Sequence, residues 1–596
     1  MEKFDQRQRL LLVIALSFGF ITLLQVVFGE KPDPNAVATA GADAGVVVAA
    51  ATSDGGAEVA AAPAVVDADG GVAAVMAAGG TPAEVAKVLP MRELDRVRRQ
   101  MNLRFSTEGG SLTSAVLTGP REREQQQVSI AEGFQKLFGK KLPPPEQMNM
   151  AVPSDGQPNP LSVGIVGGVP FGPNTRYEVV EETDQAIAFR ASNAAWQVDK
   201  RYTWEPDGFA LNLAVTVKNL SSAATSGTLS VVLPRRIDPK SEEKSSLFGG
   251  IGNEAKVHCL VGDDLGTHAP SEDPIEDAKG AVKLAAIDQQ YFLAAVYPKG
   301  ESIDGACSVL TSPTVRVASV STPIALQAGE SKTIELAAFM GPKDFELLKA
   351  TGHGLEKTVD FGWWAVICKV LLAVLQFFFR LVGNWGLAII LLTVSVKVLL
   401  LPLTHKAMVS AEAMKKLQPK MEEIKKKFPD DRERQNVEVM KLYQEAKVNP
   451  LGGCLPLLLQ LPIWAALFTT LRTSYDLYGE PFYGPVWTDL TYKDPTYLLP
   501  FALGITMIIT QRLQPQMMDK QQAFIFTWIM PVFFTALMMN YPAGLSLYIF
   551  TNNLLSILQQ FLLRKYLEKK GIAAPRSKGG GSPPGPGDKR LKESAS

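Results

Sequence analysis

The chain has 596 residues with 60 Lys or Arg against 60 Asp or Glu, so its formal net charge is zero and it has no overall electrostatic preference for nucleic acid. Hydrophobic residues make up 46% of the chain, which points to very apolar segments and hence to a membrane protein. Four cysteines and four histidines in so long a chain exclude a disulfide scaffold and argue against a metal centre with several ligands.

The first apolar segment, residues 10–28, carries no charge and follows Lys3, Arg7 and Arg9. It is long enough to cross a bilayer, and the positive-inside rule places the residues before it in the cytoplasm. The alternative is a cleaved signal peptide, but the apolar run is longer than usual and the small residues around Ala38 lie too far beyond it. We therefore expect residues 1–30 to be an uncleaved transmembrane anchor.

Residues 31–90 consist mainly of Ala, Gly, Val and Asp, and no basic residue occurs between Lys31 and Lys87. Such a segment has too few large apolar side chains to offset the entropy lost on ordering. It is expected to be a disordered linker.

Residues 91–345 contain short runs of alternating polarity separated by turn signals. One example is 197–204, followed by Glu205-Pro-Asp-Gly and then by 209–217. This pattern predicts a large all-β sandwich domain. Because the linker follows the first span on its outer side, the domain is expected outside the cytoplasm.

The β-domain shows no motif for catalysis or for a cofactor. His258 and His268 are its only histidines and have no metal-like spacing, so His258 and the adjacent Cys259 are interpreted as ordinary strand residues. Cys259 and Cys307 either pair or stay as thiols, and the sequence leaves both open. The glycine-containing stretch from Gly133 to Lys141 lacks the spacing of a phosphate loop, so we expect no bound cofactor and no ATP hydrolysis.

The C-terminal third contains five further apolar runs of spanning character. One of them, 496–511, is short and carries Pro500. Together with the anchor they predict six spans, and the five C-terminal ones define a core over 383–563. The five runs are 383–403, 452–471, 496–511, 523–539 and 543–563.

A further apolar stretch, 363–382, differs because Lys369, Gln376 and Arg380 fall within about 40° of one another on a helix. A helix with one cationic stripe is typical of a membrane surface and not of a span. We therefore expect residues 346–382 to form amphipathic helices at the outer interface.

Loop charges agree with that topology. Residues 405–450 and 564–596 carry 11 and 9 Lys or Arg, whereas 473–494 has Lys493 as its only base. The first two segments are then cytoplasmic and the third is outside, with both termini in the cytoplasm and 564–596 a basic disordered tail.

Residues 404–450 predict a cytoplasmic helical hairpin. A coiled-coil seam steps by three and four residues from Met414 to Phe428 and is echoed by Val439, Leu442 and Ala446. Pro429, Asp430 and Asp431 supply the stop and the next helix start, and Pro419 should kink the first arm. The basic surface either is solvated or docks anionic lipid, ribosomal RNA or an acidic chain; its lysines are Lys415, Lys416, Lys420, Lys425, Lys426 and Lys427.

Polar residues within the spans are the candidate functional residues. Lys397 lies past the middle of 383–403, where a lysine costs ~2.5–3.5 kcal/mol, and no Asp or Glu in any span is available to pair with it. This favours a hydrated groove with a standing positive charge. Thr393 is one turn earlier on the same face, and Gln460 and Asn552 lie at the middle of their spans; for Gln460 alone, an interhelical hydrogen bond is the favoured interpretation.

Five motifs in this region closely resemble the YidC family of membrane protein insertases. They are Gly383-Asn-Trp-Gly, Leu401-Pro-Leu-Thr-His-Lys, Leu417-Gln-Pro-Lys, Asn449-Pro-Leu-Gly-Gly-Cys-Leu-Pro and Pro542-Ala-Gly-Leu-Ser-Leu-Tyr. The anchor and large β-domain look like the Gram-negative branch. The resemblance implies a mutarotase-like periplasmic super-sandwich and a five-helix insertase core around a groove. Lys397 matches the groove's positive residue, usually an arginine, and Thr393 and Gln460 match its lining.

The resemblance implies a protein of the bacterial inner membrane that inserts nascent membrane proteins without ATP, acts on no small-molecule substrate and is not an enzyme. Its implied partners are the ribosome, the Sec translocon and membrane lipids. One alternative is a secondary transporter, but the sequence shows no inverted repeat. Another is a membrane-anchored periplasmic carbohydrate enzyme, but spacing alone gives no pair of catalytic carboxylates.

Overall fold

The structure is a computed structural model. It describes residues 90–125, 130–137, 144–152, 157–237, 254–269, 275–312, 314–429, 431–446, 455–482, 487, 489–513 and 523–569. The expected anchor, the linker up to residue 89 and the tail beyond residue 569 lie outside these residues.

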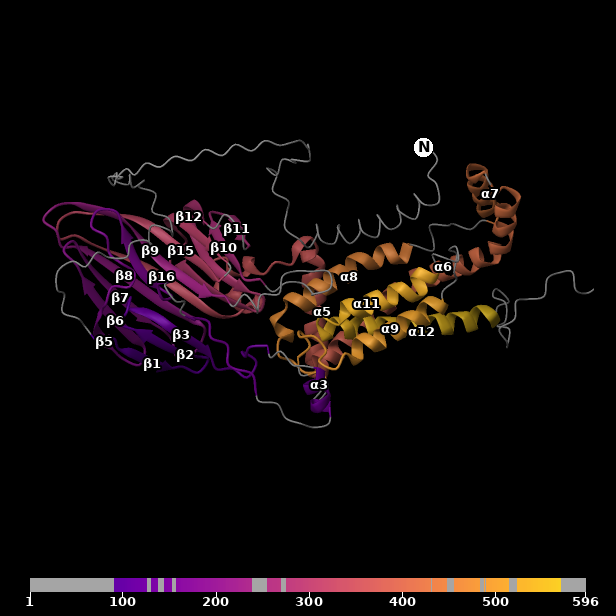
Figure 1. Cartoon of the computed structure of the whole chain (residues 1–596), viewed down its shortest axis with the longest axis horizontal. Helices are drawn as coiled ribbons and strands as arrows, with labels where there is room; N and C mark the ends of the chain where they lie inside the picture. Colours follow the sequence, from indigo (N-terminus) through magenta and orange to yellow (C-terminus); the bar gives the residue numbers. More distant parts are fainter. Residues whose placement is uncertain are drawn as a thin grey trace, which may run out of the picture.

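The N-terminal domain is built from antiparallel strands in two sheets, at the left of Figure 1. The larger sheet has 13 strands in the order β4-β9-β15-β14-β12-β13-β16-β8-β7-β6-β5, with β10 and β11 joined to it at β12. The strands are β1 (Glu93–Val97), β2 (Met101–Ser106), β3 (Ser111–Leu117), β4 (Ser162–Val166), β5 (Glu178–Glu182), β6 (Ala186–Ser192), β7 (Trp196–Thr203), β8 (Ala210–Asn219), β9 (Thr225–Arg236), β10 (Lys256–Val261), β11 (Asp264–His268), β12 (Ile275–Gln289), β13 (Phe292–Pro298), β14 (Ile303–Thr311), β15 (Val315–Leu326) and β16 (Ser331–Pro342).

The smaller sheet, β1-β2-β3, packs against one part of the larger one. Phe105 of β2 lies 4.9 Å from Tyr202 and 5.6 Å from Trp204, centroid to centroid, and all three rings are buried. Alternation along β7 places Trp196, Val198, Lys200 and Tyr202 inward, as period-two patterning requires. The all-β prediction is therefore confirmed, with a second layer of only three strands.

The two cysteines left open by the sequence form a disulfide. Cys259 lies in β10 and Cys307 in β14, two strands that both pair with β12, and their Cα atoms are 5.9 Å apart. His258 lies in β10, as interpreted, and its ring contacts Asp288 and Thr267.

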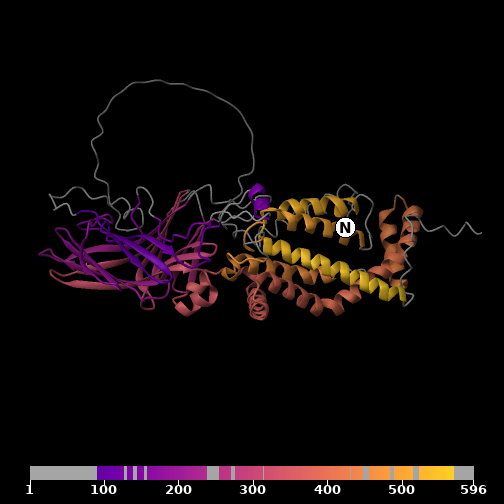
Figure 2. The ribbon, with the colours of Figure 1, turned by 90° about the horizontal axis from the view of Figure 1, so that it is seen from below.

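Helices form the second part of the molecule. The described ones are α3 (Ile130–Leu137), α4 (Phe345–Thr351), η1 (Leu355–Thr358), η2 (Gly362–Trp364), α5 (Ala365–Val382), α6 (Trp385–Lys427), α7 (Arg432–Glu445), α8 (Leu455–Thr473), η4 (Tyr475–Leu477), α9 (Leu498–Leu513), η5 (Ile525–Ile529), α11 (Met530–Met538) and α12 (Ala543–Lys569). Figures 1 and 2 show α6, α8, α9, α11 and α12 running along the bundle, whereas α5 lies across the end nearest the sheets.

Helix α6 joins two elements that the sequence analysis treated separately. It begins at Trp385, where the side chain of Asn384 accepts a hydrogen bond from the Leu387 N–H, and it stays helical through Pro402 and Pro419 to Lys427. The second predicted span and the first arm of the hairpin are therefore one helix of 43 residues. Asp431 caps α7 by accepting from the Arg434 N–H at 3.0 Å, so the predicted helix start is confirmed.

The count of six spans is not confirmed by the described residues. Gly362–Val382 and Trp385–His405 are long and apolar enough to cross a membrane, and Leu498–Leu513 and Ile525–Met538 are apolar but shorter. The segment expected to lie flat on the membrane, 363–382, is thus as long and as apolar as a membrane-spanning helix. The 523–539 run contains the π-helical turn η5, which ends two residues before Pro531, a residue with no N–H for the helical ladder.

The loop between α8 and α9, residues 474–497 and here called the outer loop, is docked on the β-domain. Arg121 and Glu480 form a salt bridge at 2.9 Å. The Tyr475 hydroxyl donates to Glu122 at 3.0 Å, and the Tyr478 ring packs on Phe292 at 5.1 Å. The outer loop and the β-domain therefore share one end of the bundle, and the hairpin lies at the other end (Figure 1).

Candidate functional site

Lys397 projects from α6 toward α12. Its side chain is half-buried, and its Nζ donates to the Ser556 Oγ at 2.8 Å. Ser556 in turn donates to the Asn552 carbonyl one turn earlier, also at 2.8 Å. Within the described part of the chain, Lys397 has no ion pair, so a neutral hydroxyl is its partner.

One face of α12 connects the polar residues of three helices. Tyr548, Asn552 and Ser556 follow one another at intervals of four residues and so share that face. Gln460 of α8 is a hydrogen-bond partner of the buried Tyr548 hydroxyl. The structure thus brings Lys397, Gln460 and Asn552 to a single side of α12.

The polar contacts continue toward the hairpin. Gln559 of α12 donates to the Thr404 Oγ1 of α6 at 2.6 Å. We call Lys397, Thr404, Ser556 and Gln559 the polar seam. Two buried polar atoms of α12, Asn553 Nδ2 and Gln560 Oε1, have no hydrogen-bond partner among the residues described.

Thr393 does not take part in this arrangement. It is 1% exposed, and its hydroxyl donates to the Ile389 carbonyl of its own helix at 2.6 Å. Such back-bonding satisfies a threonine inside an apolar helix without a partner from another element.

Sequence reasoning missed Thr404, Tyr548, Ser556 and Gln559. The spacing of Tyr548 and Ser556, four residues before and after Asn552, was the available signal. Thr404 and Gln559 carry no comparable signal, because each is an ordinary polar residue near the end of an apolar run.

The predicted basic hairpin is exposed where its side chains are described. Lys420, Lys426 and Lys427 are exposed, and Met414, on the predicted coiled-coil seam, is buried. The Tyr443 hydroxyl contacts the Met421 Sδ at 3.3 Å and joins the two arms. Lys415, Lys416 and Lys425 lie on the same arm of α6, and their side chains lie outside the description.

The polar stripe of α5 faces the β-domain end. Lys369 Nζ lies 5.1 Å from the centroid of the Phe345 ring, and Gln376 donates to Asp476 of the outer loop at 3.0 Å, while Arg380 is exposed. The neighbouring face of α5 is apolar and exposed, and it continues into the preceding turn η2; its residues are Trp363 of η2 and Val366, Val370, Phe377 and Leu381 of α5.

No group of three or more His, Cys, Asp or Glu that suits a metal ion occurs in the described ranges. The polar seam offers hydrogen bonds and one positive charge, that of Lys397. A lysine held among apolar helices is found in integral membrane proteins, where such residues face the interior of the bundle or a water-filled cavity.

Comparison with known proteins identifies the family. Residues 377–570 match the family described as 60Kd inner membrane protein, and residues 99–374 match the YidC periplasmic domain. Membrane protein insertase YidC of Anaeromyxobacter sp. (strain K) is 38% identical over 78% of this chain and 83% of its own. The Geobacter metallireducens protein of the same name is 34% identical over 85% and 91%.

A crystal structure of an active YidC insertase with its first transmembrane domain resolved is also similar, with 20% identity, coverage of 79% of this chain and 92% of that chain, and a TM-score of 0.34. The sequence matches alone show that the chain belongs to the YidC family of membrane protein insertases. It is accordingly a multi-pass inner-membrane protein with a periplasmic β-domain.

Proposed function

We propose that this chain inserts nascent membrane proteins into the inner membrane through a hydrated groove lined by Lys397, Gln460, Asn552 and the polar seam. The observation that carries the proposal is the partner of Lys397, a neutral hydroxyl from a helix 159 residues further along the chain. A lysine among apolar helices costs ~2.5–3.5 kcal/mol, which water or an acidic client offsets.

The proposed mechanism follows from the free energy that a client's polar groups lose when they leave water for the hydrocarbon of the bilayer. A client's hydrophilic flank would enter the groove, where Lys397 attracts acidic groups and the seam replaces part of the lost hydration. Asn553 and Gln560 add hydrogen-bonding capacity, because their buried amide atoms have no partner among the described residues. Lysine attracts as a point charge and lacks the planar fork of arginine, so the interaction requires no fixed geometry in the client.

Bilayer thinning is a second part of the proposal. Helix α9 and the η5–α11 segment are apolar but shorter than a full span. A bilayer that thins to match them shortens the path of the polar flank.

The proposed topology has six spans, cytoplasmic termini and α5 flat on the outer surface. The acidic outer loop is docked on the β-domain, which supports a topology in which both lie on the same side of the membrane. The exposed apolar face of α5, next to its polar stripe, suits a helix half-sunk in the interface.

The hairpin over 404–450 and the tail over 564–596 are proposed to bind the ribosome and anionic lipid through charge, with the Sec translocon as a further partner. If RNA phosphates are the target, co-sedimentation with ribosomes should weaken steeply between about 50 and 200 mM salt. Co-sedimentation that is independent of salt would contradict a phosphate contact.

The test of insertion uses the purified full-length chain in lipid vesicles and a single-span client with an acidic tail. Protease protection of the tail should rise above that of protein-free vesicles, and the same client with its carboxylates neutralised should depend less on the protein. Equal protection with and without the protein would refute the proposed function.

A further inference from the structure

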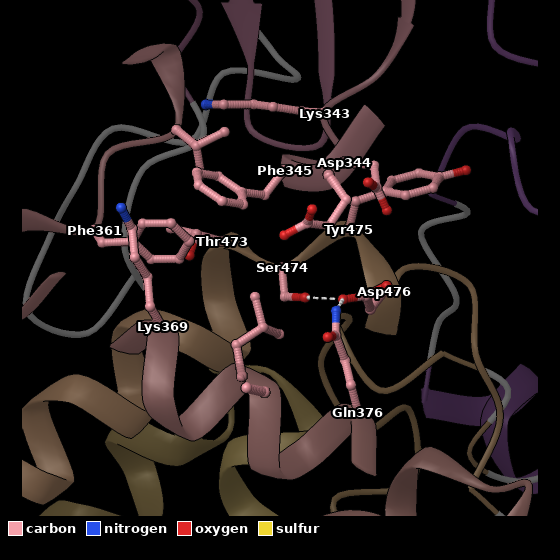
Figure 3. Close-up of a pocket in the computed structure, with 14 residues that line it drawn as sticks. Lys343, Asp344, Phe345, Phe361, Lys369, Gln376, Thr473, Ser474, Tyr475 and Asp476 are labelled. Carbon is pink, nitrogen blue, oxygen red and sulfur yellow. Dashed lines mark hydrogen bonds between the residues drawn. The ribbon is translucent and has the colours of Figure 1, made fainter. Parts of the chain in front are cut away.

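A cavity of about 220 Å³ lies where the β-domain, α5 and the outer loop meet (Figure 3). Asp344 and Phe345 line it from the end of the β-domain, Lys369 and Gln376 from α5, and Asp476 from the outer loop. Ligand sites for drug-sized molecules measure about 300–1,000 Å³, so this cavity suits a smaller, headgroup-sized ligand.

One side of the cavity is acidic. Asp476 accepts hydrogen bonds from Gln376 Nε2 at 3.0 Å and from Ser474 Oγ at 3.2 Å, both neutral donors. Burial raises the pKa of Asp476 and the nearby Asp344 carboxylate raises it further, whereas the hydrogen bonds from Gln376 and Ser474 and the positive charge of Arg121 lower it. A cation between Asp344 and Asp476 would relieve both burial and repulsion.

The other side carries one available ammonium. Lys343 also lines the cavity, but its Nζ donates a hydrogen bond to Asp288, which is not a lining residue. Lys369 instead lies beside the Phe345 ring and has no ion pair within the described ranges (Figure 3). The cavity therefore presents three carboxylates, those of Asp344, Glu346 and Asp476, and one ammonium without an ion pair in the described ranges, an arrangement that suits a ligand with both a cationic and an anionic group.

An apolar surface adjoins the cavity along α5. Val370 and Phe377 directly follow the lining residues Lys369 and Gln376, and they are 58% and 57% exposed. With Trp363 and Val366 they form an exposed stripe on the neighbouring face of the helix. A ligand held in the cavity thus meets an apolar track on one side.

We propose that this cavity binds the headgroup of phosphatidylethanolamine, a phospholipid that carries a primary ammonium beside its phosphate. The ammonium lies between Asp344 and Asp476, the phosphate binds Lys369, and the acyl chains follow the apolar stripe of α5. The assignment rests on the proposed position of α5 at the outer membrane surface. Bound lipid would hold the β-domain, α5 and the outer loop together, because each contributes a residue to the cavity.

The test is a binding titration of the purified full-length protein with short-chain phosphatidylethanolamine, phosphatidylcholine and phosphatidylglycerol, followed by native mass spectrometry. Phosphatidylethanolamine should bind at least about tenfold more tightly, since the quaternary nitrogen of choline has no N–H to donate to the carboxylates and glycerol has no charge. Equal affinity for the three lipids would overturn the proposal.

Variants locate the site. The double variant Asp344→Asn with Asp476→Asn keeps the shapes and the helix cap of α4, and it should remove the preference for phosphatidylethanolamine. Lys369→Gln should weaken binding about three- to tenfold through loss of the phosphate contact. Lys332→Gln, at an exposed position of β16 ten residues before the end of that strand and outside the cavity lining, is the matched control and should bind like the parent. Unchanged preference in both test variants would place the lipid elsewhere.

Two further ligands distinguish the source of the chemistry. Free phosphoethanolamine should bind much more weakly than the lipid, because it lacks chains for the apolar stripe; equal affinity would point to a soluble ligand. Galactose binding that the same variants abolish would make this a sugar site. Insertion by the variants is measured in parallel, so lost lipid binding with normal insertion refutes neither the groove nor the family function.

Discussion

Lys200 of the β-domain and Lys397 of the helical bundle are both withdrawn from bulk water, but they differ in burial and in the number of their hydrogen-bond partners. Lys200 is fully buried, and its Nζ donates to the Gly109 and Leu161 carbonyls at 2.9 and 2.7 Å. It also lies over the rings of Tyr177 and Tyr202, at 5.6 and 5.4 Å from their centroids. Lys397 is only half-buried and has a single hydroxyl partner, Ser556.

The difference separates a structural lysine, whose hydrogen bonds are satisfied within the β-domain, from a lysine that stays available to water or to a client. Burial holds the pKa of Lys200 well below its usual range, and two fixed carbonyls and two rings satisfy its amine. An ammonium with three donors and one protein acceptor retains capacity for water or for a client. Buried charges in the β-domain should therefore govern stability, and Lys397 should govern activity.

The largest expected effect concerns the buried cluster of Asp288, His258 and Lys343. Asp288 is 8% exposed, lies 3.2 Å from His258 Nε2 and is also bound to Lys343. Asp288→Asn should lower the free energy of unfolding by about 3–5 kcal/mol, because it leaves a buried ammonium without its counter-charge. Urea denaturation at neutral pH measures this.

The control is Asp263→Asn, which removes an exposed partner of Lys283 at 3.0 Å and should cost less than about 1 kcal/mol. Losses of equal size in the two variants would show that burial does not strengthen the Asp288 contacts.

The same cluster predicts a pH dependence. Burial opposes ionisation, but Lys343 and His258 outweigh it and lower the pKa of Asp288 from 3.8 to about 2. A carboxyl group with a lowered folded-state pKa stabilises the protein above its unfolded value, and this stabilisation is lost as the pH falls from about 4 to about 2. The parent should lose stability in this window, and Asp288→Asn should lose less.

The second prediction is that Lys200→Met destabilises the β-domain by about 1–3 kcal/mol, because the Gly109 carbonyl loses its buried donor. The loss is limited because the Tyr202 hydroxyl also reaches the Leu161 carbonyl, at 3.4 Å. Thermal unfolding of the parent and variant measures it. A variant as stable as its parent would remove the contrast between the two lysines.

The third prediction concerns Lys397, whose replacement should lower activity and leave stability nearly unchanged. Lys397→Ala should unfold within about 1 kcal/mol of the parent but insert acidic-tailed, single-span clients about tenfold less efficiently. Lys397→Arg should work at least as well as the parent, and Lys397→Glu should be worst because it repels the tail. Protease protection in cells, beside melting curves of the purified variants, gives both quantities.

Neutralising the client's carboxylates is the matched control. It should rescue Lys397→Glu at least partly, since the repulsion then has no partner. Loss of insertion that follows loss of melting temperature, or equal activity of the Glu and Arg variants, would contradict the groove mechanism.

Local chemistry was predictable from the sequence, and contacts between distant segments were not. The start of α7 follows from Asp431 and its neighbours, because a cap needs only adjacent residues. The pairing of Cys259 with Cys307, 48 residues apart, depends on the register of β10 and β14 against β12. Lys397 was recognised by its position in an apolar run, whereas its partner 159 residues away depends on how α6 packs on α12.

The smallest expected effect, Ser556→Ala, decides whether the seam is wet. Among the described residues, Ser556 accepts the one hydrogen bond that Lys397 donates to the protein, and it donates to the Asn552 carbonyl. In a dry bundle its loss would leave an ammonium without that acceptor and cost about 1.5–3 kcal/mol, the value for a hydrogen bond to a charged group. In a hydrated groove, water replaces the hydroxyl, so the variant should unfold within about 0.5 kcal/mol of the parent and insert clients within about twofold.

The measurements are those used for Lys397, and Ser395→Ala is the matched control. Its exposed hydroxyl bonds only its own helix, at the Leu391 carbonyl. If Ser556→Ala alone loses more than about 1.5 kcal/mol, Lys397 is held as rigidly as Lys200 and the distinction between the two lysines fails.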